Sequence, residues 1–452
     1  MRKPLFLTVI CFCSSIVFAA PLDQKVEQII RNNKLKNTRA GVYAVSLPKN
    51  KVVIDINKEL PLNPASCMKL VTSAVALKTL GPDYRFPTDF YLADSDLWVK
   101  GYGDPSFVIE RLEEAVNGLI AKGLPVSIDD VYIDDTYLDG GSFPGRQKGS
   151  ARSYNAMTSA VALNHGSVTV EVFPGDKSGR PAQVVVDAPG VKVVNKAVTG
   201  PRRGKTTVSI KRSYTKDGDI VVVSGRIPTN SSGRKQYFNV ANPTQHFGDS
   251  LKAMLVAKGV RVNGDVHYGI VPKASRPLME EMSPPLSEIL KNMNKNSSNF
   301  MAEQLTKAIG AKVKGAPGST EKGVSAYRGY LEHLGASGFS IENGSGLSYK
   351  NELTPYDLYL VMSDIYSDRH LRDVYIDSLS IAGEDGTLKR WNNALSGKLK
   401  AKTGSLNGVS SLAGFWPQRN ETILFVIFLN GGVDFTRGRR VSQAIVEAFT
   451  DL

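Results

Sequence analysis

Residues 65–82 of the chain read ASCMKLVTSAVALKTLGP. Apolar side chains recur along one face of this stretch, and Gly81 followed by Pro82 ends it, which is typical of a helix. Ser66 stands at the start of the helix and Lys69 comes three residues later, so both side chains are expected on the same face. The stretch therefore predicts a packed helix that carries a serine and a lysine side by side in its first turn.

A serine and a lysine at this spacing can act as a nucleophile and its base. A serine hydroxyl is a poor nucleophile at neutral pH and needs a base within hydrogen-bond reach. Burial of Lys69 would favour its neutral form, because the ammonium loses its hydration. The same spacing recurs at Ser232–Lys235 and Ser319–Lys322, but these pairs lie in polar, turn-like contexts that bury no lysine. Ser66 is thus the predicted catalytic nucleophile and Lys69 the predicted base.

A second motif, Ser297-Ser298-Asn299, follows a polar run and stands at the start of a helix predicted over 298–309. At a junction between a loop and a helix, a hydroxyl and an amide can both project into a cleft. Ser297 and Asn299 are therefore candidates for a catalytic role. The alternative is that Ser297 merely caps the helix, which is a common use of serine.

The third motif is Lys402-Thr403-Gly404, which is followed by Ser405 and by a strand predicted over 411–416. A strand that carries a lysine, a hydroxyl and a glycine allows a substrate backbone to pair with its edge, because glycine leaves room for a close approach. The ammonium would face a carboxylate. Lys402, Thr403 and Gly404 are therefore candidates for substrate binding.

The three motifs, in this order and in these contexts, resemble those of the class C low-molecular-mass penicillin-binding proteins, the DacB-like D-alanyl-D-alanine carboxypeptidases and endopeptidases. Three further stretches extend the resemblance, namely 101–105, 342–348 and 383–388. The interval between Ser66 and Ser297 is far longer than in β-lactamases. The family is similar to this chain in placing inserted domains there.

The resemblance implies an α+β fold. A β-lactamase/transpeptidase-like domain, an antiparallel sheet flanked by helices, would span 20–87 and 274–452 and would be interrupted by an insertion over 88–273. Short runs of β-forming residues separated by turn residues fill this insertion. They predict a β-rich region of two nested domains between the first and second active-site motifs.

The resemblance also implies a role for each candidate catalytic residue. Ser66 attacks the carbonyl of the penultimate D-alanine while Lys69 accepts its proton. Ser297 relays a proton toward the leaving amine, and Asn299 holds the peptide amide or Lys69. Water then releases the acyl group from Ser66.

Substrate binding is implied in the same way. Lys402 and Thr403 bind the terminal carboxylate, and the backbone N–H groups of Ser66 and Ser405 form an oxyanion hole. The implied partners are peptidoglycan stem peptides that end in D-Ala-D-Ala, and β-lactam antibiotics, which are similar to this substrate and trap Ser66.

The N-terminal residues predict export. Arg2 and Lys3 precede an apolar run over 5–18, and a small residue follows at Ala19. This pattern is typical of a signal peptide, here residues 1–19, since the run is too short for a comfortable bilayer span. The mature protein is therefore expected in the periplasm, either soluble or peripherally associated with the envelope.

The formal net charge is +13, from 56 lysine and arginine residues against 43 aspartate and glutamate residues. The basic residues are scattered, which favours a weak affinity for wall carboxylates or an envelope surface over a nucleic-acid partner. The five histidines have no ligand spacing, so no metal and no other cofactor are predicted. The sequence leaves the oligomeric state open.

Two other functions are compatible with the motifs. A β-lactamase or an esterase would use the same acylation residues and would turn over penicillin rapidly. A non-catalytic wall-binding protein would rely on its basic surface and keep the motifs as relics, although all three motifs are intact. The predicted function is therefore a serine-type D-alanyl-D-alanine carboxypeptidase with endopeptidase activity.

Overall fold

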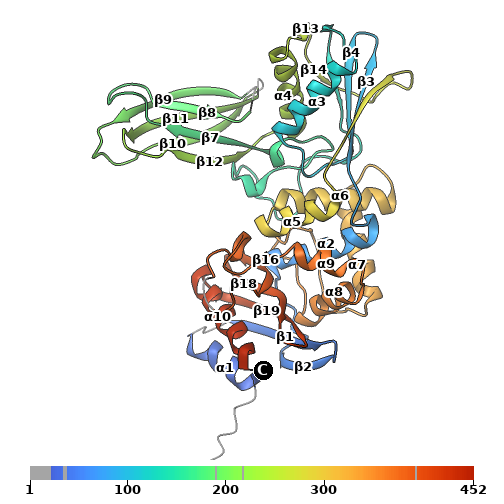
Figure 1. The fold of residues 1–452 in the computed structure, drawn as a ribbon, viewed down its shortest axis with the longest axis vertical. Coiled ribbons are helices and arrows are strands. Elements are labelled where there is room, and N and C mark those ends of the chain that lie inside the picture. The colour runs from blue at the N-terminus through green and yellow to red at the C-terminus, as the bar shows by residue number, and fades with distance from the viewer. Residues whose placement is uncertain (1–21, 34–37, 189–190, 216–217, 392–393, 452) are drawn as a thin grey trace, which may run out of the picture.

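The computed structural model describes residues 22–33, 38–188, 191–215, 218–391 and 394–451. Figure 1 shows an elongated molecule with a sheet at one end, a group of helices in the middle and strand-rich modules at the other end. The predicted signal peptide, residues 1–19, lies outside the described residues. Among the helices that are described, none combines the length and the apolar character that crossing a membrane requires.

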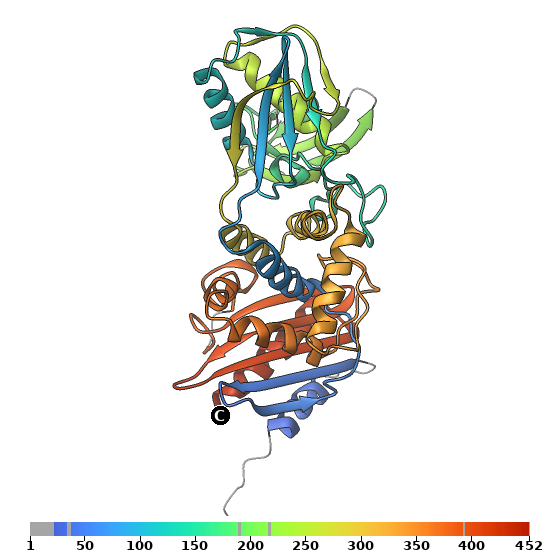
Figure 2. The ribbon, with the colours of Figure 1, turned by 90° about the vertical axis from the view of Figure 1, so that its right-hand side faces the viewer.

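A six-stranded antiparallel sheet forms one end of the molecule, in the order β16-β17-β18-β19-β1-β2. Its strands are β1 (Arg39–Leu47), β2 (Lys51–Ile56), β16 (Ser380–Ile381), β17 (Lys400–Leu406), β18 (Gly408–Pro417) and β19 (Thr422–Val433). Helices α1 (Leu22–Asn32) and α10 (Phe435–Glu447) cover one face of the sheet (Figure 2). Helices α2 (Met68–Leu80) and α8 (Pro355–Ser367) pack against the other. Residues 423–429 of β19 are consequently all buried, and the predicted α+β class with an antiparallel sheet flanked by helices is confirmed.

The helix predicted at Ser66 begins with a 3-10 turn, Ala65–Cys67, and continues as α2. Every residue from Met68 to Leu77 is buried, so the helix packs on all sides and not on one face only. Its helical neighbours are α5 (Leu286–Asn296), α6 (Asn299–Lys314), α7 (Thr320–His333), α8 and α9 (Arg372–Asp377). The turn that carries Ser66 is thus held between the sheet and the helices.

Between α2 and α5 the chain forms a strand-rich insertion with two modules. The first module is a five-stranded sheet in the order β14-β6-β4-β3-β15, which shares a core with α3 (Ile109–Ala121) and α4 (Pro243–Ala257). Its strands are β3 (Pro87–Ala93), β4 (Asp96–Gly101), β6 (Val131–Asp134), β14 (Val266–Tyr268) and β15 (Arg276–Met282), beside a short parallel pair, β5 (Ser127–Ile128) and β13 (Arg261–Val262).

The second module, which we call the projecting lobe, consists of two three-stranded sheets around a separate apolar core. One sheet has the order β10-β11-β9 and the other β12-β7-β8. The strands are β7 (Ser167–Phe173), β8 (Gln183–Val186), β9 (Lys192–Gly200), β10 (Ser209–Thr215), β11 (Gly218–Pro228) and β12 (Arg234–Asn239). Figure 1 shows the lobe extending sideways from the long axis of the molecule.

The β-rich prediction for the insertion misses two helices, α3 and α4. The start of α4 has sequence signals, because Asn242 accepts a hydrogen bond from the N–H of Gln245 at 3.1 Å and Pro243 occupies the first helical position. Both helices bury apolar positions against the five-stranded sheet. The domain boundaries given above remain a proposal.

Candidate active site

Lys69 lies beside the hydroxyl of Ser66, as their spacing predicts. The Lys69 Nζ donates to Ser66 Oγ at 3.1 Å, to Asn299 Oδ1 at 2.8 Å and to the carbonyl oxygen of Ser345 at 2.6 Å. The lysine side chain is completely buried. Three acceptors from three separate segments therefore hold the amine against the predicted nucleophile.

The surroundings of Lys69 favour its neutral form. Burial, followed by the nearby charge of Lys402, lowers the pKa of Lys69 well below its ordinary value. The carboxyl of Glu303 opposes this shift, but burial raises the pKa of Glu303 in turn. Glu303 also accepts a hydrogen bond from the N–H of Ser345 at 2.8 Å. A neutral amine has two N–H groups, which donate to Asn299 and Ser345, and a lone pair that accepts the hydrogen bond of the Ser66 hydroxyl. In this state Lys69 can take the proton of Ser66, which a lysine at its ordinary pKa cannot do at neutral pH.

Ser297 occupies a strained backbone position between α5 and α6. Its φ of 54° lies in the left-handed region, which is unfavourable for a residue with a Cβ atom. The cap of α6 is made by Ser298, whose hydroxyl accepts a hydrogen bond from the N–H of Met301 at 3.3 Å. The alternative that Ser297 caps the helix is therefore wrong. Its hydroxyl instead accepts a hydrogen bond from Lys402 Nζ at 2.9 Å.

Lys402 lies on β17, a strand with a partly open edge. The strand pairs with β18 along its length, whereas β16 pairs only with its first residues, Lys400 and Ala401. The edge from Lys402 onward can therefore accept an extended peptide. Burial lowers the pKa of Lys402 to about 8.

Gly404 allows β17 to approach the turn that carries Ser66. A Cβ atom at position 404 would lie 2.8 Å from the backbone nitrogen of Ser66 and 2.8 Å from the carbonyl oxygen of Pro64. Any other residue would push the strand away from the serine. Ser405 follows and lines the same cavity as Ser66.

The catalytic cavity has a volume of about 410 Å³. Among the predicted site residues, those that line it are Ser66, Ser297, Asn299 and Ser405. Lys69 and Lys402 are buried beneath its surface. Thr403 and Gly404 instead line a cavity of about 200 Å³ on the α10 side of the sheet, where Thr403 donates a hydrogen bond to the hydroxyl of Thr387 at 2.8 Å.

Two tyrosines of the cavity have no counterpart among the predicted site residues. The backbone carbonyl of Tyr154, from the insertion, accepts a hydrogen bond from Asn299 Nδ2 at 3.1 Å. The hydroxyl of Tyr349 accepts one from the N–H of Asn407 at 3.1 Å. Tyr154 is exposed in a short 3-10 helix, Ser153–Asn155, and Tyr349 is exposed in a turn; no local pattern indicates that they meet the three motifs.

In the part of the chain that the structure describes, no group of three or more histidine, cysteine, aspartate or glutamate side chains is arranged to hold a metal ion. Cys67, next to the nucleophile, is buried, and its Sγ lies 3.3 Å from the carbonyl oxygen of Lys402. The thiol therefore packs behind the site. The absence of a cofactor stays a prediction.

The sequence matches a family model along almost its whole length. The model is described as the D-Ala-D-Ala carboxypeptidase 3 (S13) family, and it matches residues 22–452. A D-alanyl-D-alanine carboxypeptidase from Actinomadura sp. (strain R39) is 30% identical over 440 residues, which are 91% of this chain and 81% of the relative. The D-alanyl-D-alanine carboxypeptidase DacB of Haemophilus influenzae is 26% identical over 458 residues, which are 93% of this chain and 91% of the relative.

Solved structures share the fold. The crystal structure of penicillin binding protein 4 (dacB) from Haemophilus influenzae superposes with a TM-score of 0.77 at 24% identity, covering 94% of this chain and 98% of that one. A predatory peptidoglycan endopeptidase from Bdellovibrio bacteriovorus gives a TM-score of 0.51 at 17% identity, covering 90% and 92% of the two chains.

Proposed function

The chain belongs to the D-Ala-D-Ala carboxypeptidase 3 (S13) family, and on this basis we propose that Ser66 is the nucleophile with which it cleaves D-alanyl-D-alanine peptides of peptidoglycan. The chain is a serine-type D-alanyl-D-alanine carboxypeptidase, and the proposal extends its activity to cross-links, which contain the same type of bond. The observation that supports this proposal best is the hydrogen bond between Ser66 and the buried Lys69, whose amine Asn299 also holds.

Acylation begins when Ser66 Oγ attacks the carbonyl carbon of the penultimate D-alanine. The proton of the hydroxyl passes to the neutral amine of Lys69 as the new C–O bond forms. The backbone N–H groups of Ser66 and Ser405 stabilise the negative charge on the carbonyl oxygen. Lys402 holds the terminal carboxylate, and Asn299 holds the amine of Lys69 in place as the base.

The tetrahedral intermediate collapses when the C–N bond breaks. Ser297 Oγ donates a proton to the leaving nitrogen and takes one from Lys402, to which it is hydrogen-bonded. The amine thus leaves with one proton more, Lys402 holds one fewer, and Lys69 holds the proton of Ser66. Water then attacks the ester carbon and gives a proton to Lys402 through Ser297. The ester C–O bond breaks, the acyl group leaves as the new carboxyl terminus, and Lys69 returns its proton to Ser66 Oγ.

The wild-type protein is expected to release D-alanine from a diacylated tripeptide that ends in D-Ala-D-Ala, and not from the matched peptide that ends in L-Ala-L-Ala. Penicillin is expected to form a long-lived covalent adduct. Chromatography of the peptide products and intact-mass measurement of the protein check both outcomes. Rapid hydrolysis of penicillin without an adduct would instead assign the chain to the β-lactamase or esterase alternative, and no reaction with either compound would favour a wall-binding role.

The rate of acylation is expected to rise and then fall with pH. Lys69 must lose its proton to act as base. Because its pKa is lowered, the amine loses this proton at a pH below the ordinary pKa of lysine, and acylation becomes faster as the pH rises through this range. Lys402 must keep its proton to bind the carboxylate, and its pKa of about 8 means that this ability is lost above about pH 8. The second-order rate constant of penicillin labelling, measured against pH, checks this profile. Lys402→Arg should lower the rate at every pH, because arginine cannot give a proton to Ser297, but should remove the alkaline decline, because arginine stays protonated. A decline that persists in this variant would refute the assignment to Lys402.

The site of action follows from the substrate. Peptidoglycan lies outside the cytoplasmic membrane, and the predicted signal peptide would bring the chain to it. We therefore place the mature enzyme in the periplasm, where its scattered basic residues favour a weak association with anionic envelope groups.

A further inference from the structure

A second cavity adjoins the catalytic one at the Ser297-Ser298-Asn299 motif. Its volume is about 470 Å³, against about 410 Å³ for the catalytic cavity. Tyr154, Ser297 and Asn299 line both cavities, whereas Ser66 lines only the catalytic one. We call this second cavity the far groove. A molecule bound at Ser66 can extend into it past Ser297.

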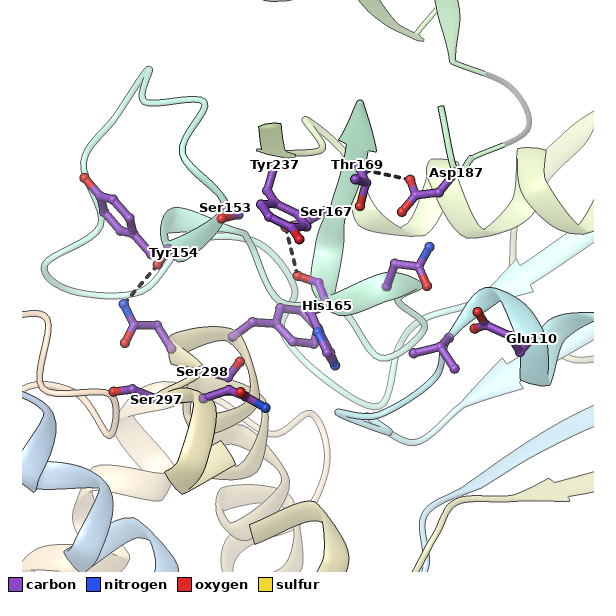
Figure 3. Close-up of a pocket in the computed structure, with 15 residues that line it drawn as sticks. Glu110, Ser153, Tyr154, His165, Ser167, Thr169, Asp187, Tyr237, Ser297 and Ser298 are labelled. Carbon is purple, nitrogen blue, oxygen red and sulfur yellow. Dashed lines mark hydrogen bonds between the residues drawn. The ribbon is translucent and has the colours of Figure 1, made fainter. Parts of the chain in front are cut away.

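The far groove lies between the α5–α6 junction and the projecting lobe. Figure 3 shows Ser297 and Ser298 on one side, and Thr169, Asp187 and Tyr237 on the facing side. Thr169 and Tyr237 are directly opposite each other on the paired strands β7 and β12. The carboxylate of Asp187 accepts a hydrogen bond from the N–H of Thr169 at 2.6 Å. The projecting lobe therefore forms an ordered side of the far groove, opposite the Ser297-Ser298-Asn299 motif.

The lining of the far groove is polar and lacks permanent positive charge. Its charged side chains are the carboxylates of Glu110 and Asp187, and none of the described residues that line it is a lysine or an arginine. This is unusual in a chain with a net charge of +13. The imidazole of His165 also lines it, and burial lowers the pKa of this group, which favours its neutral form. Hydroxyl and amide groups and the rings of Tyr154 and Tyr237 complete a surface that suits neutral or cationic peptide groups.

We propose that the far groove binds the peptide strand that carries the leaving amine when the substrate is a cross-linked wall peptide. The inference rests on the proposed function, in which Ser297 protonates the leaving nitrogen. A single departing D-alanine ends close to Ser297. The amine of a cross-link belongs to a second stem peptide. This peptide continues beyond Ser297 and reaches the side of the far groove that the projecting lobe forms. The two carboxylates favour an amine, which becomes an ammonium after cleavage.

The competing occupant is a glycan strand of the wall, because hydroxyl groups and tyrosine rings also suit sugars. A peptide strand is favoured because the groove opens directly at Ser297, where the bond breaks, and because a stem peptide is the group attached to that bond. The experiment therefore uses substrates without glycan, and then the same substrates with glycan.

The test compares Tyr237→Ala with the matched control Tyr214→Ala. Both tyrosines are about half exposed, at 53% and 52%, and both lie on strands of the projecting lobe, but only Tyr237 lines the far groove. Each protein is assayed with a glycan-free pentapeptide that ends in D-Ala-D-Ala, and with a glycan-free dimer of two stem peptides joined through a D-alanyl cross-link. Labelling with penicillin checks that each variant keeps an intact catalytic cavity.

Tyr237→Ala is expected to lower kcat/KM for the dimer by about threefold to tenfold, mainly through KM, and to leave the pentapeptide unaffected. Tyr214→Ala is expected to leave both substrates unaffected. An unchanged dimer rate, or an equal loss on both substrates, would overturn the proposal. A loss that appears only when glycan is attached would assign the groove to glycan and would also overturn it. If the wild type cleaved neither substrate, the proposed function itself would fail, which is a separate outcome.

Discussion

Ser66→Ala is expected to abolish covalent labelling by a fluorescent penicillin and to lower D-alanine release by at least about 10³-fold. The variant lacks the oxygen on which the acyl-enzyme forms, while Lys69, Asn299 and Ser297 keep their places. Catalysis would then depend on substrate binding and the oxyanion hole alone. Intact-mass measurement after incubation with the penicillin reads the adduct directly.

The matched control is Ser232→Ala. Ser232 has the same spacing to Lys235 as Ser66 has to Lys69, but it is exposed in a loop. This control should be labelled as fully as the wild type. A Ser66→Ala protein that still formed the adduct would remove Ser66 from the role of nucleophile.

Lys69→Arg is expected to lower the rate of acylation by about 10³-fold. A guanidinium stays protonated near neutral pH and cannot accept the proton of Ser66. The planar guanidinium group also fits poorly in a space where the single nitrogen of Lys69 is hydrogen-bonded to Ser66, Asn299 and Ser345. The time course of labelling by a fluorescent penicillin measures the rate.

Lys307→Arg is the matched control for placing arginine at a buried lysine. Lys307 is also completely buried, and its amine donates to the carbonyl oxygen of Gly140 at 2.9 Å, outside the catalytic cavity. Thermal unfolding of both variants separates a loss of stability from a loss of the base. If Lys69→Arg were labelled as fast as the wild type, Lys69 could not be the base.

The local part of the site can be predicted from the sequence, and its long-range contacts cannot. Ser66 and Lys69 share one helical turn, so their spacing alone predicts that they meet. The stretch 342–348 extends the family resemblance, but nothing in it indicates that the carbonyl of Ser345 reaches Lys69, since this contact depends on the packing of a distant loop. Glu303 had one available signal, because it lies four residues after Asn299 and therefore on the same helix face.

The backbone conformation at Ser297 decides which serine caps α6, and the sequence does not predict this conformation. The sequence Ser297-Ser298 contains two residues that can cap a helix, and composition does not distinguish them. The left-handed φ of Ser297 moves the cap to Ser298 and directs the first hydroxyl to Lys402. The sequence does not predict helices α3 and α4, because the short apolar runs around them are compatible with strands as well as with helices.

The pairing of β1 with β19 affects when this enzyme can become reactive. Arg39 pairs with Asn430 and Leu47 with Thr422, so the central part of the sheet joins segments from opposite ends of the sequence. Contacts between such distant segments close a long loop of chain, and the loss of chain entropy makes them slow to form. A chain in which these segments have not yet paired therefore lacks β17 beside Ser66. Such a chain is expected to stay inert toward penicillins and wall peptides until the whole sheet has formed.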